Sequence, residues 1–167
     1  MKIDLIVVGK IKDKNLDALI KEYLKRLSGY ATLNLIELPD EVMSDKPTDF
    51  EINKAKENEG KRILKRIPSN AHVILFDLVK KQPTSIEFAK YLDTKLVQYN
   101  GHLCFVIGGS YGLSEEVRAR SNDRISLSNM TFTHQMTRLI ALEQIYRAFK
   151  INHNEVYHKW KWTFGTI

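Results

Sequence analysis

The segment FVIGGSYGLSEEV, residues 105–117, joins an apolar run to the start of a helix through a glycine turn. The run stops at Gly108 and Gly109, and Ser114 then stands in position to cap a helix that begins with two glutamates. Continuous apolar runs of this kind are typical of strands buried on both faces of a parallel sheet. The segment therefore predicts a strand–loop–helix unit of an α/β protein.

Strand and helix patterns alternate along the rest of the chain as well, and no internal repeat or low-complexity segment interrupts them. Strands are expected at 2–8, 32–38, 72–78, 102–108 and 124–128, and helices at 15–27, 48–67, 84–99, 114–120 and 132–151. This alternation predicts one α/β domain with a mainly parallel sheet flanked by helices. Ligands of such sheets bind beyond the carboxyl ends of the strands, which directs attention to Phe76, Gly108 and Leu127.

Composition narrows the class of protein only moderately. The 167 residues include 26 Lys and Arg against 20 Asp and Glu, and the resulting net charge of +6 is a modest indication of a polyanionic partner. No segment approaches the ~20 apolar residues of a membrane span. The single cysteine, Cys104, lies inside an apolar run and is expected to be buried, which fits a reducing, cytoplasmic environment.

The glycine spacing excludes two common phosphate-binding loops. Gly108, Gly109 and Gly112 do not match the dinucleotide fingerprint, and no Gly-Lys-Ser/Thr follows as in a Walker loop. Adjacent glycines still allow a backbone to approach a flat ligand closely. The turn by itself leaves two interpretations open, a ligand cradle or a bare connection from strand to helix.

Three further motifs carry a family resemblance. They are SLSNMTFTHQ at 126–135, EQIYRA at 143–148 and the pair Tyr157-His158. Together with the IGGSYG turn, these motifs closely resemble the RlmH family of the SPOUT superfamily of RNA methyltransferases. The resemblance extends from VVGK at 7–10 over nearly the whole chain.

The resemblance implies a fold, an activity and partners. It implies a SPOUT-type domain over residues 1–159 with a C-terminal trefoil knot, followed by an atypical tail at 160–167. It also implies a homodimer that uses S-adenosylmethionine, without a metal, to methylate N3 of a pseudouridine in 23S rRNA within the assembled ribosome. Two alternatives stay open: a SPOUT methyltransferase with another RNA target, and a catalytically silent RNA- or ribosome-binding protein of the same fold.

The resemblance also assigns the residues that hold the methyl donor. These are Phe76, Gly108, Leu127, Ser128, Asn129, Met130, Thr131 and Phe132. The chemistry agrees with this assignment, because adenine suits an apolar slot whose backbone groups read its polar edge.

Methyl transfer from a sulfonium depends on alignment of the nucleophile, and removal of the N3 proton would help the attack. His134, at the entrance to the last helix, is the first candidate; the alternative is a histidine satisfied by nearby backbone. Arg138 lies four residues on and is expected on the same helix face, holding a phosphate or the cofactor carboxylate. Its alternative is a solvated surface arginine.

Tyr157 and His158 are catalytic candidates through the resemblance, which implies that they reach the target base. Composition alone would describe them as part of an exposed, frayed end. Val156 stands where the family usually has proline, and the chain continues beyond the usual end with WKWTFGTI. The two tryptophans of that tail could stack on RNA or pack on a partner subunit.

Several other polar residues receive structural interpretations. Glu143 and Arg147 are spaced as an ion pair along a helix. The spacing of the histidines does not resemble that of metal ligands. Two interpretations stay open for each of two groups. Asp77 is either a ligand contact or a turn carboxylate, and the basic residues of 61–66 form either a solvated face or an rRNA-contacting ridge.

Overall fold

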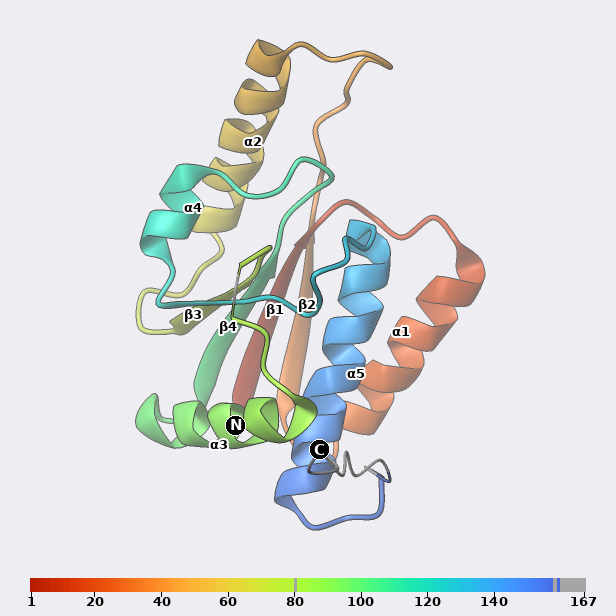
Figure 1. The fold of residues 1–167 in the computed structure, drawn as a ribbon, viewed down its shortest axis with the longest axis vertical. Coiled ribbons are helices and arrows are strands. Elements are labelled where there is room, and N and C mark those ends of the chain that lie inside the picture. Colours follow the sequence, from red (N-terminus) through yellow and green to blue (C-terminus); the bar gives the residue numbers. More distant parts are fainter. Residues whose placement is uncertain (80, 158, 160–167) are drawn as a thin grey trace, which may run out of the picture.

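The computed structural model describes residues 1–79, 81–157 and 159. Five parallel strands form one sheet in the order β2-β1-β4-β3-β5 (Figure 1). The strands are β1 (Lys2–Val8), β2 (Thr32–Leu38), β3 (His72–Phe76), β4 (His102–Ile107) and β5 (Asp123–Ile125). The helices are α1 (Lys14–Leu27), α2 (Asp49–Leu64), α3 (Ser85–Gln98), α4 (Glu115–Arg120) and α5 (His134–Asn152). The predicted α/β class and the predicted parallel sheet are confirmed.

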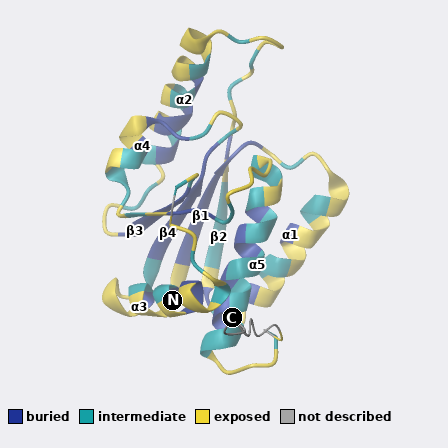
Figure 2. Ribbon diagram, viewed as in Figure 1, coloured by how far each residue is buried: buried dark blue, intermediate teal, exposed yellow. Residues whose placement is uncertain are grey.

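Helices cover both faces of the sheet. Because successive side chains of a strand point to opposite faces, β1 contributes Leu5 and Val7 to a core shared with α1, α3 and α5. Ile6 and Val8 of the same strand face α2 and α4. The central strands are accordingly buried along most of their length, as the dark blue ribbon in Figure 2 shows.

The helices begin where the sequence provides caps. Thr48 and Thr84 each form a capping box with a glutamate three residues later, and Ser114 accepts a hydrogen bond from Val117 N as the cap of α4. Thr133 caps α5 by accepting from Met136 N, so that His134 is the first residue of that helix. These caps decide where the connecting loops end.

β3 and β5 end two or more residues earlier than the sequence predicts, at points where the chain makes hydrogen bonds to segments distant in sequence. β3 ends at Phe76 because Asp77 N–H donates to Ile125 O (3.0 Å) and its carboxylate accepts from Leu78 N (2.9 Å). β5 ends at Ile125, where Ser126 N–H donates to Lys81 O (2.9 Å) in the loop after β3. This contact between two distant loops is compatible with the expected trefoil knot, which stays a prediction.

Some expectations from composition can be compared directly with the structure. Cys104 is fully buried, as predicted. In the part of the chain that the structure describes, no helix is both long and apolar enough to cross a membrane. The boundary between the domain at 1–159 and the tail at 160–167 falls at the edge of the described residues and stays a prediction.

Candidate functional site

A cavity of about 920 Å³ opens at the carboxyl ends of β3, β4 and β5. This is the position that an open α/β sheet favours for ligands. The cavity brings together all three places that the sequence analysis singled out. Its lining consists of 76–78, 107–113, 126–128 and 130–135, with Arg118 and Thr137.

Seven of the eight residues expected to hold the methyl donor line this cavity. The exception is Asn129, whose side-chain oxygen accepts a hydrogen bond from Gln82 Nε2. Asn129 therefore ties the loop between β5 and α5 to the loop between β3 and α3. In this geometry Asn129 holds two loops together and does not form part of the cavity wall.

The walls of the cavity are largely apolar. Phe76 is the last residue of β3. Its ring stacks on that of Phe105, with ring centroids 5.3 Å apart, and this contact holds the Phe76 ring in place. Met130 and Leu78 lie at the cavity and leave 72% and 62% of their surface exposed. Side chains of this kind, left open to solvent beside a cavity, are suited to cover the faces of a flat ring.

The glycine turn is tight enough to require glycine at Gly108. A Cβ placed there would lie 2.9 Å from the backbone carbon of Gly112 and 3.0 Å from its oxygen. The turn is closed by a hydrogen bond from Gly112 N to Gly109 O (3.0 Å), and Gly112 itself has φ +83°. The segment thus presents bare backbone to the cavity, in line with the first of its two interpretations.

Asp77 lies at the cavity, and its carboxylate also stabilises the turn after β3, while its role as a ligand contact stays a prediction. The carboxylate accepts further hydrogen bonds from Arg118 Nε (3.0 Å) and Arg124 Nη2 (2.8 Å). Burial opposes ionisation of this group, but the two guanidinium groups outweigh burial and lower the pKa of Asp77. The carboxylate is therefore held ionised at the edge of the cavity.

His134 stands at the cavity as the first residue of α5. Its Nδ1 lies 3.4 Å from Ser110 Oγ in the glycine turn, and its Nε2 faces Gly9 in the loop after β1. Burial lowers the pKa of the imidazole, Arg138 lowers it further, and Asp40 acts in the opposite direction. A helix N-terminus also disfavours a positive charge, so His134 is set up to be neutral near pH 7.

Arg138 differs from both of its expected states. The sequence placed it on the ligand face or on the solvated surface, yet it is fully buried and does not line the cavity. Its guanidinium donates to Glu37 Oε1 (2.6 Å) and to Gly9 O (2.8 Å). Helical spacing predicts that Arg138 lies on the same side of α5 as His134. It does not predict the partners of Arg138, because Gly9 and Glu37 belong to the N-terminal part of the chain.

Composition suggested that Tyr157 belongs to a frayed end, but in the structure its side chain is packed and hydrogen-bonded. Its hydroxyl donates to Glu143 Oε1 (3.2 Å), and its ring packs edge-on against Tyr146, with centroids 5.0 Å apart. Glu143 also forms the expected ion pair with Arg147 (2.5 Å). His158, the other catalytic candidate of this segment, lies outside the described residues.

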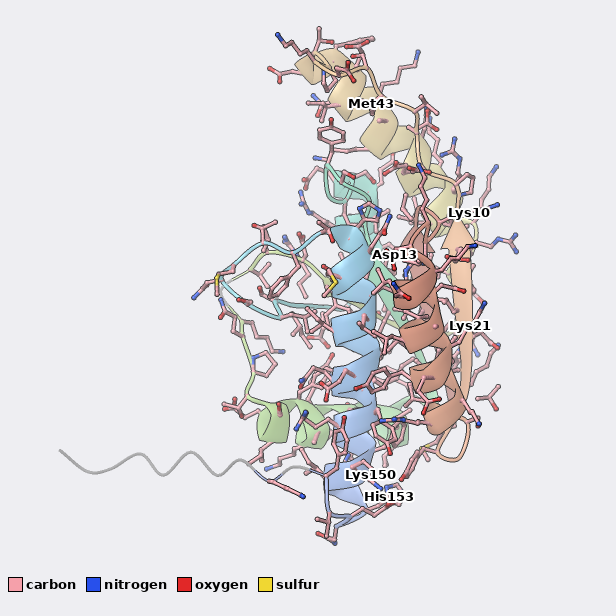
Figure 3. The ribbon with its side chains drawn as sticks, turned by 90° about the vertical axis from the view of Figure 1, so that its right-hand side faces the viewer. Lys10, Asp13, Lys21, Met43, Lys150 and His153 are labelled. Carbon is pink, nitrogen blue, oxygen red and sulfur yellow. The ribbon has the colours of Figure 1, made fainter. Side chains whose placement is uncertain are left out.

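The position of Tyr157 is remote from the cavity. At 1.5 Å rise per residue, the twelve residues from His134 to Tyr146 span roughly 18 Å along α5. Figure 3 shows Lys150 and His153 at the C-terminal end of α5, with Lys10 and Asp13 near its other end. The structure therefore brings His134 to the cavity and leaves Tyr157 elsewhere.

Replacing Tyr157 with alanine is expected to lower the thermal midpoint by about 2–8 °C, because the ring contact and the bond to Glu143 contribute about 1–2 kcal/mol. The matched variant Tyr157→Phe keeps the ring and should recover most of the loss. Differential scanning calorimetry of the three proteins decides the point. An unchanged midpoint in Tyr157→Ala would mean that the segment contributes nothing to the fold.

Sequence reasoning missed three groups around His134. Gly9 and Ser110 both stood inside motifs that were noticed for other reasons, VVGK and IGGSYG. Asp40 follows β2 with no motif around it. The available signal was the rule that all parallel strands end at one edge of the sheet, applied to β1 and β2 as well as to the three later strands.

Two histidines away from the cavity have carboxylate partners. His72 Nε2 lies 2.7 Å from Asp123 Oδ2, and His102 Nε2 lies 2.7 Å from Asp4 Oδ2. Among the residues that the structure describes, no three His, Cys, Asp or Glu side chains form a group that could hold a metal ion. The basic residues of 61–66 fall into two groups. Arg62 forms an ion pair with Glu41, whereas Lys61, Lys65 and Arg66 are exposed.

Comparisons with known proteins agree on one family. The family model described as "Predicted SPOUT methyltransferase" matches residues 1–158. Among the similar curated proteins are Ribosomal RNA large subunit methyltransferase H 1 of Clostridium perfringens (strain SM101) and Ribosomal RNA large subunit methyltransferase H of Bacillus cytotoxicus. Each is 50% identical over 159 residues, which cover 95% of this chain and 100% of the relative.

A solved structure shows the same fold. It is a probable methylase family protein from Haemophilus influenzae Rd KW20, with a TM-score of 0.51 and 15% identity over 96% of this chain and 72% of that chain. At this identity the likeness concerns the fold alone. The family model and the two relatives span nearly the whole sequence, and the sheet and cavity are those of an α/β ligand-binding domain; the chain belongs to the SPOUT methyltransferase family.

Proposed function

We propose that this protein transfers a methyl group from S-adenosylmethionine to N3 of a pseudouridine in 23S rRNA, within the assembled ribosome. The observation that carries the proposal is the cavity at the ends of three strands, where a bare glycine backbone, apolar walls and a histidine meet. The names of the two relatives, both large-subunit rRNA methyltransferases, support the class of substrate. A ribosomal substrate also supports a cytoplasmic place of action.

The residues present fit S-adenosylmethionine. The volume of about 920 Å³ lies within the range of small-molecule sites, and the tight glycine turn at Gly108 lines this cavity with backbone groups. Phe76, Leu127 and Met130 would cover the adenine, while backbone groups of the glycine turn and of the 126–133 loop would read its edge. When bound, the cofactor supplies an electrophilic methyl group on a sulfonium.

The protein's own contribution is alignment and proton transfer. The cavity walls would hold the acceptor nitrogen in line with the methyl group, so that the N–C bond forms as the S–C bond breaks. The neutral imidazole of His134 would accept the N3 proton, and Ser110 Oγ, 3.4 Å from Nδ1, would hold the ring in orientation. No metal is needed for these steps.

The proposed active unit is a homodimer. Tyr157 packs on Tyr146, which lies roughly 18 Å along α5 from His134, so that the C-terminal segment would serve a cavity only in a partner subunit. The outer face of α5 and its preceding loop also leave apolar surface open, with Met136 42% and Phe132 38% exposed. Burying this surface against a second copy would join the C-terminal segment of each subunit to the cavity of the other.

Sedimentation at micromolar concentration should therefore give about twice the 19.4 kDa mass of the chain. Met136→Glu should shift the protein toward monomer and abolish methyl transfer, because a charge in an apolar interface is costly. Phe50→Glu is the matched control, since Phe50 is 75% exposed on α2, across the sheet from α5. A fully active wild-type monomer would contradict the dimer.

The proposal is tested by comparing rRNA from cells with and without the protein. Digestion of 23S rRNA to nucleosides and mass spectrometry should show that one N3-methylated pseudouridine is missing from the deletion strain. Re-expression of the protein should restore it, whereas a His134→Gln variant should not. Identical nucleoside profiles in the two strains would overturn the proposed substrate.

A further inference from the structure

We propose that Arg138 is a positioning residue, which grips the backbone of Gly9 and thereby fixes the imidazole of His134 at the cavity. The proposal rests on the proposed function, since it gives a reason for placing that imidazole accurately. It assigns to Arg138 no contact with the substrate or the methyl donor.

The geometry around Arg138 joins three elements. The guanidinium comes from the second turn of α5, and its two terminal nitrogens donate to Glu37 Oε1 on β2 (2.6 Å) and to Gly9 O after β1 (2.8 Å). Arg138 has 0% exposure, whereas the Glu37 side chain keeps 38%. The arginine is thus a buried bridge between the start of α5 and the ends of the first two strands.

Both backbone polar groups of Gly9 are hydrogen-bonded. Its N–H donates to Leu38 O (2.8 Å), and its carbonyl accepts from Arg138. Between these anchors Gly9 has φ +86°, and a Cβ built on it would lie 3.0 Å from His134 Nε2. Gly9 is therefore a wall against which the imidazole rests, and Arg138 sets the position of that wall.

Stability alone is a poor reason for this arrangement. Burying an ionised arginine carries a desolvation cost, and buried ion pairs can often be replaced by apolar residues without loss of stability. A planar guanidinium can, however, hold a carboxylate and a carbonyl at once in fixed directions, which a lysine ammonium does less well. The bridge therefore fits a role in accurate placement.

The same residue also influences the charge of the imidazole. The charged groups that face His134 are Arg138 on its own helix and Asp40 after β2, while Ser110 and Gly9 contribute only neutral groups. Burial is the main reason why the pKa of His134 is lowered, and Arg138 adds to it. Removing the guanidinium should therefore raise the pKa of His134.

The test compares Arg138→Met and Arg138→Lys with the wild type, all as full-length protein. Arg120→Met is the control, because Arg120 is a half-buried arginine on α4 that donates to Pro68 O, away from His134. Two quantities are measured: the steady-state constants for methyl transfer to ribosomes, and the NMR titration of the His134 imidazole. Assays run well below each variant's thermal midpoint.

Arg138→Met is expected to reduce kcat about tenfold or more with KM for S-adenosylmethionine nearly unchanged, and to move the His134 titration to higher pH. Arg138→Lys should keep the His134 titration near that of the wild type, because it keeps the positive charge. It should still lower kcat and shift the Gly9 amide signal, because an ammonium lacks the two guanidinium nitrogens that hold Glu37 and Gly9 at once. A kcat in both variants equal to that of Arg120→Met would overturn the proposal.

The NMR measurement separates this proposal from the proposed function. If the wild type transfers no methyl group, a shifted Gly9 amide and His134 ring in Arg138→Lys still supports positioning, and unshifted signals overturn it. If Arg138→Met does not fold, Arg138→Lys alone decides the point, by its kcat relative to Arg120→Met and by the Gly9 amide and His134 ring signals. An unchanged kcat together with unshifted signals overturns the proposal.

Discussion

Replacing Gly108 with valine is expected to weaken S-adenosylmethionine binding at least about 100-fold, a loss of about 2.7 kcal/mol, while the sheet stays folded. The sequence suggested that a branched side chain would stand where the ligand must approach. The structure adds a second reason, since even a Cβ would lie 2.9 Å from the backbone of Gly112. The turn must therefore open, and the backbone groups that face the cavity move with it.

Isothermal titration calorimetry measures this loss, with circular dichroism as the check on folding. Gly29→Ala is the matched control, because Gly29 follows α1 and a Cβ there would meet only Arg26 O, at 3.9 Å. Its affinity should equal that of the wild type. Unchanged affinity in Gly108→Val would remove the glycine turn from the cofactor site.

Replacing His134 with glutamine is expected to lower kcat by about 10²–10³-fold and to leave S-adenosylmethionine affinity within a few-fold of the wild type. The reason is that a proton acceptor acts mainly in the transition state. His102→Gln is a control for general effects of losing a histidine, since His102 pairs with Asp4 at the amino ends of the strands. That variant should change stability rather than kcat.

The pH dependence of the wild type follows from the lowered pKa of His134. The base must be neutral to accept a proton, so kcat should be constant near pH 7 and fall as pH drops through the pKa of His134, below the ordinary value of about 6.5. His134→Gln should lose this acid limb. A wild-type limb that persists in the variant would assign the proton transfer to another group.

The positions of strands and helices followed from local pattern. Apolar runs such as 102–107 are recognisable because a strand covered on both faces needs no polar alternation. Caps such as Thr48, Thr84 and Ser114 were readable because their hydrogen bonds join residues three apart. The early ends of β3 and β5 were not readable, because they depend on bonds between loops far apart in sequence.

The outline of the site was also predictable from local pattern, because the ends of the strands mark where a ligand binds. The rule for parallel sheets, with the family resemblance, led to seven cavity residues and to His134. Arg138 was placed wrongly in its surroundings, since its partners Gly9 and Glu37 lie more than a hundred residues away. Composition alone describes Tyr157 as exposed, because nothing local predicts its packing on Tyr146.

The central claim is methyl transfer to one pseudouridine, and the most direct measurement supplies all the components in purified form. The protein is mixed with ribosomes from the deletion strain and with S-adenosylmethionine that carries a labelled methyl group. The account predicts label up to about one methyl group per large subunit, recovered after digestion as N3-methylpseudouridine, and none with His134→Gln. Label on another nucleoside, or no label on ribosomes that the wild-type protein has bound, would contradict it.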